Sequence, residues 1–319
     1  MIVDSAAVTL VQVQEPLVLI SQVQRSGGTL LSQLFDGHPE CHAHPAELHI
    51  GPNKSLWPTL QPGDSPETWF DALFELVTLE FIENGYSKTT EGARRAGTFD
   101  VFPFRFDPEL QRSIFLAEVD PGSTRRQILD AYMTSYFNAW LDNANLHTGP
   151  KRVVTAFAAA LAFRRRHLAA FFADYPDGTL VTIVREPRGW FESSRRYKAR
   201  YESVDRAVKT WSRSTRASLE AAERYGDRTI IVSFEQLVQE TEPLMRRLAE
   251  RLGLTFSDEL LVPTFNGRSI RAASSGAVQG YGVIPEPARR PELDPEADTA
   301  ITRATAELYA AARSRFLEP

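Results

Sequence analysis

The sequence has little cysteine and no excess of positive charge. Cys41 is the one cysteine in 319 residues, so an intramolecular disulfide is excluded and a cysteine-based zinc site is disfavoured. Lysine and arginine number 36 against 41 aspartates and glutamates, which gives a net charge of −5 and argues against a nucleic-acid partner. Because disulfides are typical of oxidising compartments, we expect a protein of a reducing compartment and place it in the cytoplasm.

The chain also lacks a hydrophobic run long enough to cross a membrane. The longest apolar run, from Val153 to Phe163, is much shorter than the roughly 20 residues that a spanning helix needs. No basic residue precedes Arg25, so the charged start of a secretory signal is missing. We therefore expect no membrane span and no targeting segment.

What is present is the composition and patterning of an α/β protein. Hydrophobic residues make up 43% of the chain, enough for one sizeable core, and we expect a single domain over 1–319. Short apolar runs predict strands at 17–23, 179–184 and 229–234, and a further one is expected at 151–155. Helical patterns cover 29–35, 66–84, 126–147, 161–174, 187–200, 204–225, 235–252 and 299–316. Strands that alternate with helices predict a central, mostly parallel sheet flanked by helices, with a P-loop-like opening.

A glycine-containing loop follows the first predicted strand. It runs Gln24-Arg25-Ser26-Gly27-Gly28-Thr29 and leads directly into a helix. Glycines let successive backbone amides point at one spot, and the helix N-terminus adds its dipole, so the loop is suited to hold an anion such as phosphate. It is not a Walker A loop, because the Gly-Lys-Ser/Thr ending is missing.

A second anion motif follows the strand at 179–184. Arg185 ends that strand, and Ser193 lies eight residues later on a predicted helix. A guanidinium fork and a hydroxyl could reach one phosphate, and ligands of open α/β sheets bind beyond the carboxyl ends of the strands. Alternatively, Arg185 would form a salt bridge with Glu186 or Glu192 instead of binding a phosphate. Trp190 and Trp211, at helical spacing, are assigned to the core.

Together the two motifs resemble the sulfotransferases that use 3′-phosphoadenosine 5′-phosphosulfate (PAPS). The resemblance covers residues 16–276 and is strongest to the bacterial and tyrosylprotein branch. Further matching segments are Asp36-Gly37-His38-Pro39, Tyr225–Arg228, Ser233–Val238 and Pro263–Gly267. Gln24 departs from the family's usual proline, and Gly28 from the first of its two threonines.

The resemblance implies the roles of the residues. Arg25, Ser26, Gly27, Gly28, Thr29 and Leu30 would hold the 5′-phosphosulfate, with Arg25 stabilising the charge on the leaving phosphate. Arg185 and Ser193 would hold the 3′-phosphate, assisted by Arg271, Ser274 and Ser275 in a C-terminal loop. PAPS would be the co-substrate, PAP the product, and no metal is expected.

The family resemblance also implies a base that takes the proton of the acceptor. Glu47 lies near the position of the glutamate in the tyrosylprotein branch, and His44 and His49 compete with it because histidine is the base in other branches. A glutamate in a partly desolvated cleft can have a raised pKa suited to this task. The structural alternative is that Glu47 only caps or decorates a helix.

The acceptor and two competing functions stay open. Residues 50–150 are expected to form a mainly helical insertion that shapes the acceptor site. The aromatic stretch 99–106 would line an apolar pocket or, as the more common case, belong to the core. The acceptor would be a small molecule, a carbohydrate or a lipid.

Two other functions compete with that of a sulfotransferase. One is a P-loop-type kinase, which would differ by its need for magnesium. The other is a non-catalytic nucleotide-binding member of the fold. The sequence does not indicate the oligomeric state.

Overall fold

A computed structural model describes residues 10–50, 56–86, 101–196, 198–271, 280–284 and 293–318. Within these residues, five parallel strands form a sheet in the order β2-β3-β1-β4-β5. Their bounds are β1 Leu17–Ile20, β2 Cys41–Glu47, β3 Val153–Phe157, β4 Thr179–Val184 and β5 Thr229–Ser233. The predicted α/β class with a parallel central sheet flanked by helices is confirmed.

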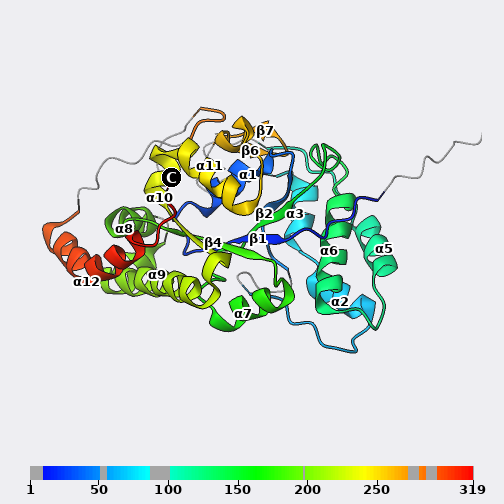
Figure 1. The fold of residues 1–319 in the computed structure, drawn as a ribbon, viewed down its shortest axis with the longest axis horizontal. Helices are drawn as coiled ribbons and strands as arrows, with labels where there is room; N and C mark the ends of the chain where they lie inside the picture. The colour runs from blue at the N-terminus through cyan, green and yellow to red at the C-terminus, as the bar shows by residue number, and fades with distance from the viewer. Residues whose placement is uncertain are drawn as a thin grey trace, which may run out of the picture.

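Helices cover both faces of this sheet (Figure 1). Side chains alternate along β1, so Leu17 and Leu19 face one layer and Val18 and Ile20 the other. The helices of the described residues are α1 Gly28–Asp36, α2 Pro66–Leu73, α3 Val77–Asn84, α5 Pro108–Glu118, α6 Arg125–Ala139, α7 Arg165–Asp174, α8 Pro187–Arg195, α9 Val204–Tyr225, α10 Phe234–Gln239, α11 Thr241–Leu252 and α12 Pro295–Arg313. A short hairpin, β6 Thr264–Phe265 and β7 Arg268–Ser269, packs near α1.

Several helix starts follow from local sequence chemistry. Ser65, Asp107 and Asp294 each accept a backbone N–H of the helix that they precede, and each is followed by proline at the first helical position. Thr124 and Gln127 form a capping box at the start of α6. Within the described ranges, no helix has both the length and the apolar character required to cross a bilayer.

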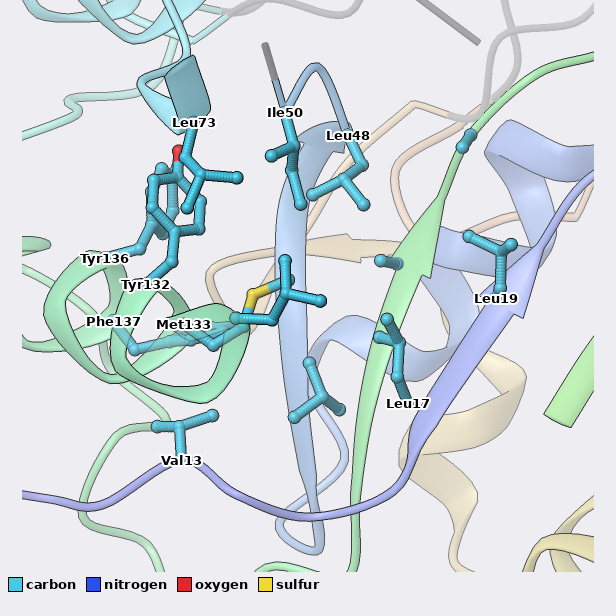
Figure 2. Packing of buried hydrophobic residues seen from close by; sticks show 14 of the residues in the cluster. Val13, Leu17, Leu19, Leu48, Ile50, Leu73, Tyr132, Met133, Tyr136 and Phe137 are labelled. Carbon is cyan, nitrogen blue, oxygen red and sulfur yellow. The ribbon is translucent and has the colours of Figure 1, made fainter. Parts of the chain in front are cut away.

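The helices α2 and α6 pack against the β2 side of the sheet. Figure 2 shows Tyr132, Met133 and Tyr136 projecting from α6, with Leu73 at the end of α2 close to the two tyrosine rings. Leu48 and Ile50, just beyond β2, lie in the same cluster. This apolar layer lies beside the end of β2, where the His44 side chain is fully buried.

Two predicted helices are each divided in the structure. The prediction of one helix over 66–84 is wrong, because the backbone leaves the helical region at Phe74 and Glu75 turns into the protein interior. The helix expected at 235–252 is interrupted at Glu240, ahead of Pro243 in the first turn of α11. Proline lacks the N–H of a continuous helix, so this second interruption has a signal in the sequence.

In and around the sheet, one strand was not predicted and the bounds of other elements differ from the prediction. No strand was predicted at β2, whose sequence Cys-His-Ala-His-Pro-Ala-Glu lacks the usual apolar run. The expected strand at 151–155 lies at 153–157, and the helix expected at 161–174 begins only at Arg165. Residues 158–164 instead form a turn that hydrogen-bonds to the segment after β1. The helix expected at 126–147 ends at Ala139.

A partly buried ion pair connects α6 and α7. Arg125 donates from Nε and Nη2 to the two carboxylate oxygens of Asp174, at 2.8 and 2.7 Å. Trp57 Nε1 donates to the same carboxylate at 2.7 Å. The Asp174 side chain is only 6% exposed, so its removal would leave buried donors without an acceptor.

We expect Asp174→Ala to lower the free energy of unfolding by about 2 kcal/mol, less than a fully buried pair because Arg125 is one-third exposed. Urea unfolding followed by circular dichroism measures this. Glu220→Ala, which removes the exposed pair with Arg165, is the control and should leave the midpoint nearly unchanged. Equal midpoints for the two variants would contradict the structural role of Asp174.

Candidate functional site

The candidate site lies where β1 and β4 pair in the middle of the sheet. From β1 the chain continues through α1 to the edge strand β2, and from β4 it continues through α8 and α9 to the opposite edge strand β5. The connections leave in opposite directions, and open α/β sheets bind ligands at such a point, beyond the carboxyl ends of the strands. Both anion motifs follow the two strands and therefore meet there.

The loop after β1 has a backbone that only some residues adopt. Gly27 has a φ of 99°, a conformation that favours glycine, and a Cβ there would lie 2.6 Å from Phe234. Arg25 also has a positive φ, 69°, a strained state for a residue with a side chain. Ser26 is buried, and its Oγ has no hydrogen-bond partner among the residues described. A buried hydroxyl of this kind is a natural donor to a ligand.

The second motif contacts this loop directly. Arg25 Nε donates to Ser193 Oγ at 3.1 Å, and Arg185 Nη1 donates to the carbonyl of Arg25 at 3.0 Å. Arg185 lies over the Phe234 ring, 4.2 Å from its centroid, and its Nε lacks a partner in the described part of the chain. Glu192, the suggested partner of Arg185, pairs instead with two arginines of its own helix region. Two cationic side chains thus share one corner, in which Arg185 is buried and Arg25 is half-buried.

Electrostatics of this corner favour an anion. The pKa of Arg185 lies at about 10; burial lowers it most and the positive charge of Arg25 also lowers it, whereas the carboxylates of Glu235 and Glu186 raise it. Arg185 is still a cation at neutral pH, and a bound anion would relieve both unfavourable effects. Glu235, at the start of α10, is also largely buried, and burial raises its pKa.

Two tryptophans hold the motifs in place. Trp190 Nε1 donates to the carbonyl of Gln24 at 2.9 Å, and Trp211 Nε1 donates to the carbonyl of Arg185 at 2.9 Å. Both rings are buried, as expected for core residues. Their role as anchors of the two motifs was missed, because the sequence shows the apolar spacing and not the target of each indole N–H.

The structure explains why glycine stands at position 28. A Cβ at Gly28 would lie 2.0 Å from Gln22 Nε2 and 2.6 Å from Phe157. The side chain of Gln22 therefore fills the space that a larger residue would need, which accounts for the departure from the family's threonine. Thr29 and Leu30 follow in the first turn of α1, where Thr29 is half-buried and Leu30 packs in the core.

This packing predicts coupled effects of two substitutions. We expect Gly28→Ala to destabilise the protein by about 1–3 kcal/mol because it overfills a packed site. Adding Gln22→Ala should restore part of that loss. Urea unfolding of both single variants and of the double variant measures the coupling. Strictly additive effects would show that Gln22 does not occupy this space.

The candidate bases lie at the carboxyl end of β2. Glu47 is the last residue of that strand rather than part of a helix, and its Oε1 accepts the backbone N–H of Ala159 at 3.2 Å. The neighbouring Ala158 and Ala160 donate to the carbonyls of Ile20 and Gln22, at the start of the loop after β1. The turn after β3 therefore connects Glu47 to the anion loop.

His49 lies beside Glu47. Its Nε2 is 3.9 Å from Glu47 Oε2, and the two side chains are 14% and 27% exposed. In the described structure this ring nitrogen has no hydrogen-bond partner. A partly exposed carboxylate and a nearby imidazole whose Nε2 has no hydrogen-bond partner in the described structure are both suited to accept a proton.

His44 is placed differently. Its Nδ1 lies 3.1 Å from the carbonyl of Ala46, and its Nε2 lies 3.1 Å from Glu75 Oε1. Both partners are acceptors, since the pKa of Glu75 is lowered and its carboxyl is ionised. Both ring nitrogens therefore face acceptor atoms inside the protein, and the His44 side chain is fully buried. Glu47 and His49 keep part of their side chains exposed, so they are better placed than His44 to meet an acceptor.

Other predicted site residues lie elsewhere or outside the described residues. Arg271 is exposed, with its guanidinium 4.6 Å from the centroid of the Tyr281 ring. Ser274 and Ser275 are outside the described residues, as are residues 99 and 100. In the rest of the aromatic stretch, Phe104 and Phe106 are buried in the core. Across the described ranges, no group of three or more His, Cys, Asp or Glu side chains is arranged to hold a metal ion.

Comparison with known proteins identifies the family. The profile of the sulfotransferase family matches residues 16–258, which is most of the chain and includes both anion motifs. The chain belongs to this family. No curated protein matches it in sequence.

Solved structures of similar fold include three sulfotransferases. The sulfotransferase domain of the Synechococcus PCC 7002 olefin synthase is 22% identical, with 79% of this chain and 78% of that chain covered and a TM-score of 0.44. The sulfotransferase domain of the curacin biosynthetic pathway is 17% identical, with 92% and 98% covered and a TM-score of 0.49. A sulfotransferase from Alicyclobacillus acidocaldarius is 13% identical, with 94% and 99% covered and a TM-score of 0.42.

Proposed function

We propose that this protein transfers the sulfuryl group of PAPS to a hydroxyl or amine of an acceptor. The observation that carries the proposal is the meeting of Arg25, Arg185 and Ser193 beyond β1 and β4. Two neighbouring cations, of which Arg185 is buried, favour a ligand with several negative charges. PAPS has such charges at two separate positions, and the corner is built from two separate motifs.

The residues present fit this nucleotide. Ser26 Oγ and Arg185 Nε are buried polar atoms without partners in the described structure. The loop amides, Ser26 and Thr29 would hold the 5′-phosphosulfate at the N-terminus of α1. Arg185 and Ser193 would hold the 3′-phosphate, the group that distinguishes PAPS from ATP.

The chemistry is an in-line displacement at sulfur. The bond from sulfur to the bridging oxygen of the 5′-phosphate breaks, a bond from sulfur to the acceptor oxygen or nitrogen forms, and PAP is the leaving group. The protein aligns the reacting atoms, and Arg25 stabilises the negative charge that develops on the phosphate. Glu47 or His49 takes the acceptor's proton. The scheme itself calls for no metal ion.

The acceptor is proposed only as a class: a small molecule, a carbohydrate or a lipid with a hydroxyl or amine. Helices α2 and α6, from the region between 50 and 150, lie beside the end of β2 where the candidate bases are found. This placement supports the proposal that the region shapes the acceptor site.

The donor site is tested by ligand binding without metal. We expect PAP to raise the melting temperature more than adenosine 5′-monophosphate, which lacks the 3′-phosphate. Arg185→Ala should weaken PAP binding by about 10- to 100-fold, because a hydrogen-bonded charge is lost. Arg246→Ala, on the exposed face of α11, is the control and should leave binding unchanged. A shift with ATP and magnesium, and none with PAP, would favour the kinase and contradict the proposal.

The base is tested by turnover of PAPS. We expect Glu47→Gln to lower the rate of PAP release in the presence of an acceptor by about 10²- to 10⁴-fold, while PAP affinity stays unchanged. His49→Gln should have the smaller effect if Glu47 is the base, and the larger effect if the imidazole is. Wild-type rates in both variants would show that neither residue accepts the proton, and PAP binding without turnover would favour a non-catalytic protein.

A further inference from the structure

A buried carboxylate lies at the interruption between α2 and α3. Glu75 is 1% exposed, and its neighbours are Leu73 at the end of α2 and the tyrosines of α6. Figure 2 shows Tyr132 and Tyr136 directed from α6 toward the end of α2 that precedes Glu75. An ionised group in such surroundings is costly unless strong partners surround it.

Three donors surround this carboxylate. Oε1 lies 3.1 Å from His44 Nε2 and accepts the Tyr132 hydroxyl at 3.1 Å. Oε2 accepts the backbone N–H of His49 at 2.8 Å. Burial alone would raise the pKa of Glu75, but these contacts, with that of His44 the largest, lower it. The carboxylate thus contacts both ends of the segment 44–49.

The bulged part of that segment, residues 44–46, is weakly held by the sheet itself. In the β2–β3 ladder Ala43 pairs with Thr155 and Glu47 with Phe157, so four steps along β2 correspond to two along β3. The residues between them bulge out of the ladder, and Pro45 has no N–H to donate. Since β2 is also an edge strand, no second neighbouring strand of the described sheet fixes these residues.

We propose that Glu75 is the positioning residue that fixes Glu47 and His49 for proton transfer. It replaces the missing ladder contacts, holding the bulge through the His44 ring and the residues beyond β2 through the His49 amide. This inference rests on the proposed function, because it assigns Glu75 to the base side of the reaction and not to the donor site. Glu75 itself does not contact the reacting atoms.

Glu75→Gln tests the proposal with little change in shape. Glutamine has one acceptor oxygen where glutamate has two, so its NH₂ group must face either the His49 amide or the His44 and Tyr132 donors. The control is Glu40→Gln, just before the start of β2. Glu40 also accepts a backbone N–H, from Thr255, but at the opposite end of the strand.

Four quantities are compared in wild type and both variants. Hydrogen exchange of the His49 amide should be roughly tenfold faster in Glu75→Gln. The kcat for PAP release from PAPS, with 4-nitrophenol as acceptor, should fall by about 100-fold through misplacement of the base. The KM for PAPS and the affinity for PAP should stay at wild-type values. Glu40→Gln should change none of these quantities.

The outcomes separate the two proposals. Wild-type exchange of the His49 amide in Glu75→Gln, or an unchanged kcat, overturns the positioning role. An equal loss of PAP affinity and kcat also overturns the positioning role, because such a loss would show general damage to the fold. Failure of the wild type to bind PAP counts against the proposed function, whereas the amide exchange still decides whether Glu75 anchors the segment.

Discussion

Pairing of β1 with β4 in the middle of the sheet is the contact on which the candidate site depends. The two strands lie side by side although more than a hundred residues separate them in the chain. Their carboxyl ends therefore bring two loops together, and Arg25 Nε reaches Ser193 Oγ only because of this pairing. The indole N–H of Trp190 adds a further link from α8 to the first loop. These contacts help to offset the strain of Arg25 in its left-handed conformation.

At the β2 edge of the sheet, buried polar groups lie around the candidate bases. The bulge in β2 leaves backbone groups outside the regular ladder, and the apolar layer of α2 and α6 excludes water from them. One carboxylate, that of Glu75, contacts the His44 ring of the bulge and the His49 amide beyond β2, and the helix that the sequence pattern favours is interrupted at Glu75. The helix thus loses regular hydrogen bonds near Glu75, while the charged network gains an acceptor where water is missing.

The sequence predicted the parts of the fold that depend on local pattern. The strands β4 and β5 and the helix α9 follow from apolar periodicity, and the two anion motifs lie at the ends of β1 and β4 as expected. The edge strand β2 was missed because histidines and a proline replace the apolar run. Glu75 was missed because its partners, His44, His49 and Tyr132, are distant in the chain, so only the tertiary structure reveals the contact. The clash that excludes a side chain at Gly28 is likewise visible only once Gln22 is placed beside it.

The most direct test of this account is a crystal structure of the protein grown with PAP. The account predicts that the 3′-phosphate contacts Arg185 and Ser193, and that the 5′-phosphate lies against the amides of the loop from Arg25 to Thr29. A nucleotide bound elsewhere on the protein, or bound with its two phosphates exchanged between the motifs, would contradict the central claim.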